Sequence, residues 1–86
     1  VFNSVNTVSE LVEKIYPNPF KERLVLAVEG PSLLSITDLS GRVIWQGVTE
    51  GGAIELKTRD WLPGMYLLQV RQKESGETMG LPILKY

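Results

Sequence analysis

The stretch Met65-Tyr66-Leu67-Leu68-Gln69-Val70-Arg71-Gln72-Lys73 decides the fold of this chain. Its side chains alternate between two sets with a period of two residues, which is the period of a β-strand with two different faces. Tyr66, Leu68 and Val70 alternate with Leu67, Gln69 and Arg71. The dipeptide Pro63-Gly64 precedes this strand and suits a type II turn, because Pro presets φ and Gly accepts the positive φ that follows. The stretch therefore predicts a strand that begins directly after a tight turn.

The same reading extends to the rest of the chain. Further strands are predicted over 23–29, 32–38, 42–46, 53–57 and 77–86. Asp38-Leu39-Ser40-Gly41 suits a type I hairpin turn, and Glu74-Ser75-Gly76-Glu77 is a second tight hairpin signal. Six or seven short strands, with turn signals roughly every 8–12 residues, are typical of an all-β sandwich or barrel.

The beginning of the chain is less regular. Residues 9–15 fit either one helical turn with Ser9 as N-cap or an extended lead-in, and Pro17 and Pro19 end whichever of the two forms there. Residues 1–10 are polar and β-branched and are interpreted as a linker or a first edge strand. Residues 11–86 then form the one domain that 86 residues allow. Because the chain opens with Val1 rather than Met and shows no signal peptide, it is expected to be a piece of a longer protein.

Composition narrows the function by exclusion. The chain has no His and no Cys, which removes His-based triads, Cys nucleophiles, Cys/His zinc sites and disulfides. Nine basic residues against ten acidic ones give a net charge of −1, which disfavours nucleic acid as a partner. The Asp and Glu residues are scattered singly, and no Gly-rich phosphate loop or Asp-rich calcium loop is present. We therefore expect no enzymatic activity, no cofactor and no metal.

Three aromatic residues admit two interpretations. Trp45, Trp61 and Tyr66 could form a sugar-binding platform of the kind that β-sandwich modules carry. Core packing is the favoured interpretation, because aromatic side chains bury large areas in a domain of this size. Trp61 is the exception to watch, since it lies in a turn beside Asp60 and Pro63.

Three motifs, in this order, go beyond composition. They are Tyr16-Pro17-Asn18-Pro19-Phe20, Ile36-Thr37-Asp38-Leu39-Ser40-Gly41-Arg42-Val43 and Leu62-Pro63-Gly64-Met65-Tyr66-Leu67-Leu68-Gln69-Val70. Together they resemble the C-terminal sorting domain of the type IX (Por) secretion system, with its opening "YPNP" segment, its central "D-x-x-G-R" hairpin and its "L-x-x-G-x-Y" strand. The resemblance covers residues 15–86.

The resemblance implies a fold and a role. The fold is an immunoglobulin-like β-sandwich of about seven antiparallel strands. The role is a signal at the end of cargo proteins, attached to their upstream domains, that the translocon recognises for export through the periplasm and across the outer membrane of Gram-negative bacteria, to the cell surface or beyond. In most cargo a sortase-like surface peptidase then removes the domain and joins the cargo to anionic lipopolysaccharide.

The motif residues are expected to act mainly in the structure. They are Tyr16, Pro17, Asn18, Pro19, Asp38, Gly41, Arg42, Gly64 and Tyr66. Pro17 and Pro19 would stiffen the start of the sandwich and protect an edge, and Asn18 can bond its own backbone. Arg42 pairs with Asp38 or stays free for a partner.

The last strand is the candidate for translocon recognition. A terminal strand offers an unpaired edge and alternating side chains, the usual means of recognition by strand addition. The candidate residues are Gly80, Leu81, Pro82, Ile83, Leu84, Lys85 and Tyr86. A free edge also leaves open a homodimer or a strand-swapped form through edge strands.

This strand departs from the family pattern and leaves alternatives open. Only Lys85 matches the family's basic run, Ile83-Leu84 match its apolar pair, and Pro82 removes a ladder donor. The departure permits a retained, uncleaved domain that serves as a docking module in a surface component of the secretion machinery. A carbohydrate-binding immunoglobulin-like module is a further alternative. The identity of the parent protein, cleavage, and the translocon component that binds do not follow from the sequence.

Overall fold

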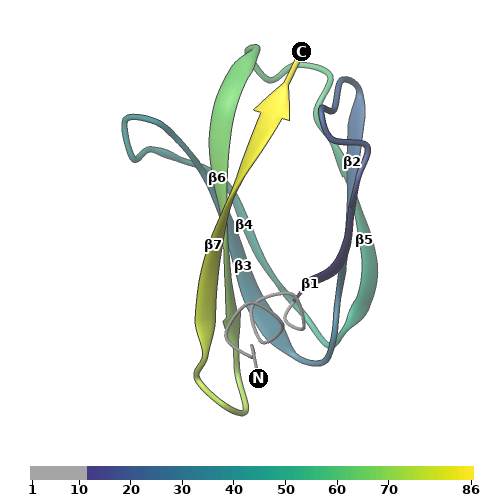
Figure 1. The fold of residues 1–86 in the computed structure, drawn as a ribbon, viewed down its shortest axis with the longest axis vertical. Helices are drawn as coiled ribbons and strands as arrows, with labels where there is room; N and C mark the ends of the chain where they lie inside the picture. Colours follow the sequence, from purple (N-terminus) through teal and green to yellow (C-terminus); the bar gives the residue numbers. More distant parts are fainter. Residues whose placement is uncertain (1–11) are drawn as a thin grey trace, which may run out of the picture.

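The computed structural model describes residues 12–86, and this part of the chain folds into seven β-strands without a helix. The predictions for residues 1–10 lie outside the described residues. In chain order the strands are β1 (Val12–Tyr16), β2 (Arg23–Val28), β3 (Ser32–Asp38), β4 (Val43–Thr49), β5 (Gly52–Lys57), β6 (Gly64–Gln72) and β7 (Thr78–Lys85). Figure 1 shows the strands as two layers that face each other.

Each layer is an antiparallel sheet. The smaller sheet has the order β1-β2-β5 and the larger one the order β4-β3-β6-β7. The chain crosses between the layers after β2, β4 and β5, whereas β3 and β4, and β6 and β7, form hairpins within the larger sheet. This is the predicted immunoglobulin-like sandwich of seven antiparallel strands.

The core lies between the sheets and follows the period-two patterns of the sequence. In β6 the buried residues are Tyr66, Leu68 and Val70, which are the residues that the alternation placed on one face. Leu34 and Ile36 of β3 pair directly with Val70 and Leu68, so their side chains lie on the same inner face. The remaining buried apolar side chains come from β2, β5, β7 and the β1–β2 loop: Phe20, Leu24, Val25, Leu26, Val28, Leu56, Met79 and Ile83.

The turns also form where the sequence predicted them. Gly41 donates to the carbonyl of Asp38 at 3.0 Å and has φ of 92°, which closes the β3–β4 hairpin. Gly76 has φ of 75° in the β6–β7 hairpin, where the amide of Gln72 donates to the carbonyl of Glu77. The extended alternative for the segment before Pro17 is the correct one from Val12 onward, because Val12–Tyr16 form β1 and pair with β2.

Trp45 closes one side of the sandwich. It lies opposite the buried Ile36 and therefore on the inner face of β4, where it packs against the core. Its indole ring lies over Gly47, since a Cβ atom at Gly47 would approach the ring to 2.9 Å. Glycine at this position therefore gives the indole ring room to lie flat along the strand.

Candidate functional site

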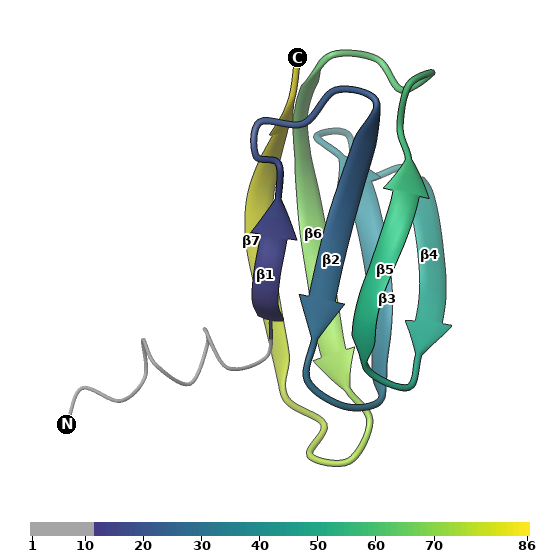
Figure 2. The same ribbon diagram turned by 90° about the vertical axis from the view of Figure 1, so that its right-hand side faces the viewer.

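The three sequence motifs meet at one end of the sandwich, which we call the motif end. Phe20 from the first motif and Tyr66 from the third pack together with Trp61, with ring centroids 6.3 Å apart for Phe20–Tyr66, 6.0 Å for Phe20–Trp61 and 5.3 Å for Trp61–Tyr66. Asp38 of the second motif pairs with Tyr66 across β3 and β6. Figure 2 shows the β1–β2 connection, the β5–β6 connection and the C-terminus at this same end.

Tyr66 ties the β5–β6 connection to the core. Its hydroxyl donates a hydrogen bond to the carbonyl of Leu62, four residues upstream, while its ring is buried. A tyrosine near the start of this strand with such a bond is a recurrent feature of immunoglobulin-like domains. Burial raises the pKa of the Tyr66 phenol, and the nearby Asp38 carboxylate raises this pKa further. The phenol therefore stays protonated and able to donate.

Asp38 organises the β3–β4 hairpin. Its Oδ1 accepts hydrogen bonds from the Ser40 hydroxyl at 2.6 Å and from the amides of Ser40 and Arg42, both at 3.0 Å. The Ser40 hydroxyl bond is the main reason that the pKa of Asp38 lies below its usual value, followed by the Arg42 amide bond. Arg42 takes the first of the two roles predicted for it, with its Nε 3.3 Å from Asp38 Oδ2, while its side chain remains largely exposed.

Segment 17–20 is hydrogen-bonded to the last strand. The amide of Phe20 donates to the carbonyl of Leu84, and the amide of Tyr86 donates to the carbonyl of Phe20, both at 2.9 Å. The Oδ1 atom of Asn18 accepts from the amide of Leu84 at 3.3 Å. The prediction that Asn18 bonds its own backbone is therefore wrong, because its carboxamide reaches a strand 66 residues further along the chain.

The outer edge of β7 is consequently not free along its length. The groups of Leu84 and Tyr86 that point away from β6 are already bonded to segment 17–20. Backbone groups of alternate residues in an antiparallel ladder point to the same edge, so those of Pro82 point to the same edge as those of Leu84. Pro82 has no backbone N–H to donate there. The expectation of an unpaired terminal edge is thus wrong for the C-terminal half of β7. It holds only toward Gly80 and Thr78.

The candidate recognition residues divide between the two faces of β7. Ile83 and Lys85 are buried, and the Nζ of Lys85 lies 3.4 Å from the carbonyl oxygen of Tyr86. Leu81 and Leu84 are half-buried, whereas Gly80, Pro82 and Tyr86 are exposed. Their role in recognition stays a prediction, but in the folded domain only part of the set is accessible to a partner.

Exposed apolar side chains lie on three separate segments of the motif end, which the sequence motifs did not indicate. Leu39 is 80% exposed in the β3–β4 hairpin, Leu62 is 72% exposed before β6, and Tyr86 is 61% exposed after β7. A depression runs between the hairpin and the β5–β6 connection and is lined by Asp38, Leu39, Ser40, Arg42, Ile44 and residues 60–66. Such side chains on loop tips contribute nothing to the core.

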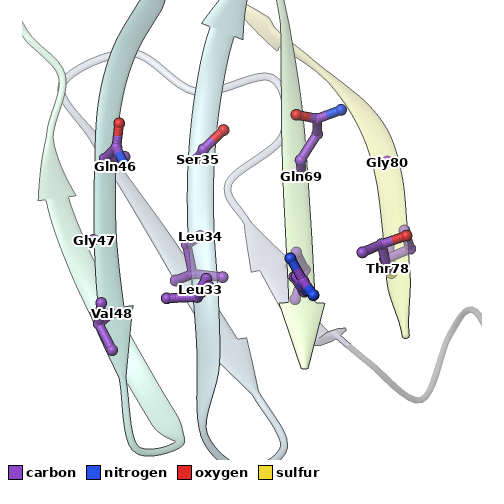
Figure 3. A pocket seen from close by; sticks show the side chains of 12 residues that line it. Leu33, Leu34, Ser35, Gln46, Gly47, Val48, Gln69, Thr78 and Gly80 are labelled. Atoms are coloured by element: carbon purple, nitrogen blue, oxygen red, sulfur yellow. The ribbon is translucent and has the colours of Figure 1, made fainter. Parts of the chain in front are cut away.

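The outer face of the larger sheet carries a second, wider groove of about 740 Å³. Figure 3 shows Gln46, Ser35 and Gln69 side by side on three neighbouring strands, with Val48 and Leu33 below them. Ser35 and Gly80 line the groove, and their small size adds to its depth. The groove has no charged side chain other than Arg71.

The aromatic residues are accounted for by packing. Tyr66 is buried, and Trp45 and Trp61 are half-buried and packed against the core. Across residues 12–86 the structure holds no cluster of three or more side chains that could ligate a metal ion. No helix in that part of the chain is long and apolar enough to span a membrane.

Comparison with known proteins connects these features to a family. The model of the family described as "Secretion system C-terminal sorting domain" matches residues 14–82, which contain all three motifs. Among curated proteins, none matches the chain at a significant level. Among solved structures, the chain is similar to PorZ, an essential bacterial surface component of the type-IX secretion system of the human oral-microbiomic Porphyromonas gingivalis. The TM-score is 0.78 at 22% identity over 91% of this chain, and the chain spans 12% of PorZ.

Proposed function

Because this chain belongs to the family of secretion system C-terminal sorting domains, we propose that its motif end is the surface that the type IX translocon recognises. The domain acts as a sorting signal, and the protein that carries it is exported to the outer membrane or cell surface. We also propose that the domain itself catalyses no reaction.

The convergence of the three motifs carries the proposal. Most of the motif residues serve the fold: Phe20 and Tyr66 fill the core, and Asp38 holds a turn. What they build together is a packed and hydrogen-bonded end on which Leu39, Leu62 and Tyr86 are displayed. Rigid presentation of apolar side chains lowers the entropic cost of binding a partner.

Further steps follow from the family role. We propose that the parent protein passes through the periplasm and that a sortase-like surface peptidase then acts on it, with anionic lipopolysaccharide as the acceptor. The upstream domains of the parent protein precede β1, which lies in the smaller sheet. β1 runs toward the motif end, so the described chain begins away from that end (Figure 2).

Retention of the domain is the second candidate. The final strand holds a single basic residue, the buried Lys85, and a proline at position 82. PorZ, to which the fold is similar, is described as a surface component of the secretion system. A retained domain would use the same motif end for docking at the cell surface rather than for a transient signal.

The decisive experiment compares the export of two variants of the parent protein in which exposed leucines are replaced. Leu39→Ser combined with Leu62→Ser alters the motif end, and Leu33→Ser removes an exposed leucine from the outer sheet face as the matched control. Both variants should fold, because exposed substitutions usually change stability by about 0.5 kcal/mol or less. Cells are fractionated, and an antibody to the upstream part detects the protein.

We expect periplasmic accumulation for the double variant and normal surface display for the control. Normal display of the double variant, with unfolding midpoints in urea equal to wild type, would exclude the motif end as the signal. A variant ending at Gly80 tests the last strand separately, and its normal export would refute the sorting role as a whole. Mass spectrometry of the wild-type surface protein then separates the two candidates, since peptides from 80–86 persist only in a retained domain.

A further inference from the structure

The sandwich has four edge strands, and they differ in how they are protected. β1 and β5 flank the smaller sheet, and β4 and β7 flank the larger one. An edge strand presents unpaired backbone groups, and proteins protect such edges with charges, prolines, bulges or covering segments. A strand without these protections is a site at which another strand can add.

Three of the four edges are protected. β7 has segment 17–20 bonded along its C-terminal half and Pro82 beside that segment. β1 is five residues long, and its register with β2 shifts between Val12 and Lys14. β5 carries the exposed charges of Glu55 and Lys57. Each of these features disfavours the addition of a further strand.

β4 lacks most of these protections. The strand Val43-Ile44-Trp45-Gln46-Gly47-Val48-Thr49 contains no charged residue and no proline. Its register with β3 shifts near Val43, so that the part beyond Trp45 pairs regularly. On the outer face of that regular part, Val48 is 58% exposed and stands next to the exposed Leu33. The edge therefore combines free backbone groups with an apolar flank.

We propose that β4 pairs antiparallel with β4 of a second copy of this chain. The two residues that bound the strand favour a copy over other occupants, because Arg42 precedes it, Glu50 follows it, and both are four residues from Gln46. A two-fold axis at Gln46 thus places Arg42 of each copy opposite Glu50 of the other. Glu50 makes no ion pair within residues 12–86, and the Arg42 side chain remains 71% exposed beside Asp38.

This pairing joins the two larger sheets into one. The strand order becomes β7-β6-β3-β4 followed by β4-β3-β6-β7 of the second copy, with both outer faces on the same side. The grooves of Figure 3 then lie on either side of the axis, and Val48 of each copy lies close to the new seam. Leu39 and Leu62 lie outside the paired segment 42–50, whereas Arg42 and Ile44, which line the depression of the motif end, lie at the seam.

The absence of cysteine from the chain allows a direct test. Gln46→Cys places a single thiol on the axis, where the two Cα atoms of an antiparallel pair are within disulfide range. Gln69→Cys is the matched control, since it lies on the same exposed face but in the sheet interior. Under mild oxidation of the 86-residue chain, we expect Gln46→Cys to form a covalent dimer at least about tenfold faster than Gln69→Cys.

A charge on the edge provides the second measurement. Val48→Lys puts a protecting lysine on the exposed flank of β4, and it should slow the cross-linking of Gln46→Cys to the rate of the control. Sedimentation velocity should show a concentration-dependent dimer for the wild-type chain and a monomer for Val48→Lys. Equal cross-linking of the two cysteine variants, or a wild-type monomer at every concentration, overturns the proposal. Preferential cross-linking of Thr78→Cys would overturn it in favour of the β7 edge.

Discussion

Tyr66 holds two parts of the motif end together with one side chain. Its ring packs against Phe20 and Trp61, and its hydroxyl donates to the carbonyl of Leu62. Aromatic pairs of this geometry contribute about 0.5–1.5 kcal/mol beyond the area they bury. Phenylalanine would keep the ring contacts and remove only the hydrogen bond, so that the two contributions can be measured separately.

Tyr66→Phe should lower the free energy of unfolding by about 0.5–1.5 kcal/mol at neutral pH. The lower end is favoured, because Leu62 is exposed and water can solvate its carbonyl. The pKa of Tyr66 is higher in the folded than in the unfolded state, so its contribution is complete below pH of about 10 and is lost as the pH rises further. Urea unfolding at several pH values should show an alkaline loss of stability in wild type that is smaller in Tyr66→Phe. Parallel pH profiles would contradict this role.

At the scale of the element, the C-terminal half of β7 has hydrogen-bonded neighbours on both sides, as an inner strand of a sheet has. β6 pairs with it on one side, and segment 17–20 pairs with it on the other. Phe20 supplies a short parallel bridge to Lys85, in a sheet that is otherwise antiparallel. The strand is therefore held between β6 and a segment near the start of the described chain.

Asn18→Ala should release this contact without disturbing the core. The amide of Leu84 loses its acceptor, and hydrogen exchange at Leu84 should speed up by about fivefold or more, as expected for the loss of roughly 1 kcal/mol. Ser40→Ala, which removes a hydroxyl bond in the β3–β4 hairpin at the same end, serves as the control and should leave Leu84 unchanged. Unchanged exchange at Leu84 in Asn18→Ala would show that this side chain does not hold the strand.

The limits of prediction from sequence also appear at this scale. The strands from β2 to β7 and the hairpin turns could be predicted, because alternation and turn residues are local signals. The role of Asn18 could not, because its partner Leu84 lies 66 residues away and an asparagine beside prolines looks like an ordinary turn residue. The gathering of the three motifs at one end likewise depends on how the strands cross between sheets, which no single motif encodes.

At the scale of the whole molecule, the domain is a slender body of 38 × 26 × 23 Å, and the motif end is one of its two tips. The motif end is closed by the aromatic cluster, and Phe20 lies at its centre with no exposed surface. A domain of this size has a free energy of unfolding of about 4–13 kcal/mol, so the loss of one central side chain can consume much of its stability.

Phe20→Ala should destabilise the domain by about 3–5 kcal/mol, because it leaves a cavity between Trp61 and Tyr66. The midpoint of urea unfolding and the intrinsic tryptophan fluorescence, to which Trp61 and Trp45 both contribute, report the change. Leu39→Ala at the exposed hairpin is the control and should shift stability by about 0.5 kcal/mol or less. A loss below about 1 kcal/mol in Phe20→Ala would mean that the cluster relaxes around the cavity.

The bond between Asn18 and Leu84 also sets an order of events during synthesis. A ribosome makes the chain from its first residue onward, so the partners of segment 17–20 are the last part of this sequence to appear. Until then the backbone of Phe20 lacks its hydrogen-bond partners Leu84 and Tyr86, and β7 does not cover the aromatic cluster. A chain that stops before β7 lacks the hydrogen bonds of Asn18 and Phe20 to Leu84 and Tyr86, and we expect the closed domain to form only after translation through β7. A closed domain is thus expected only in a chain that has been translated through the last strand.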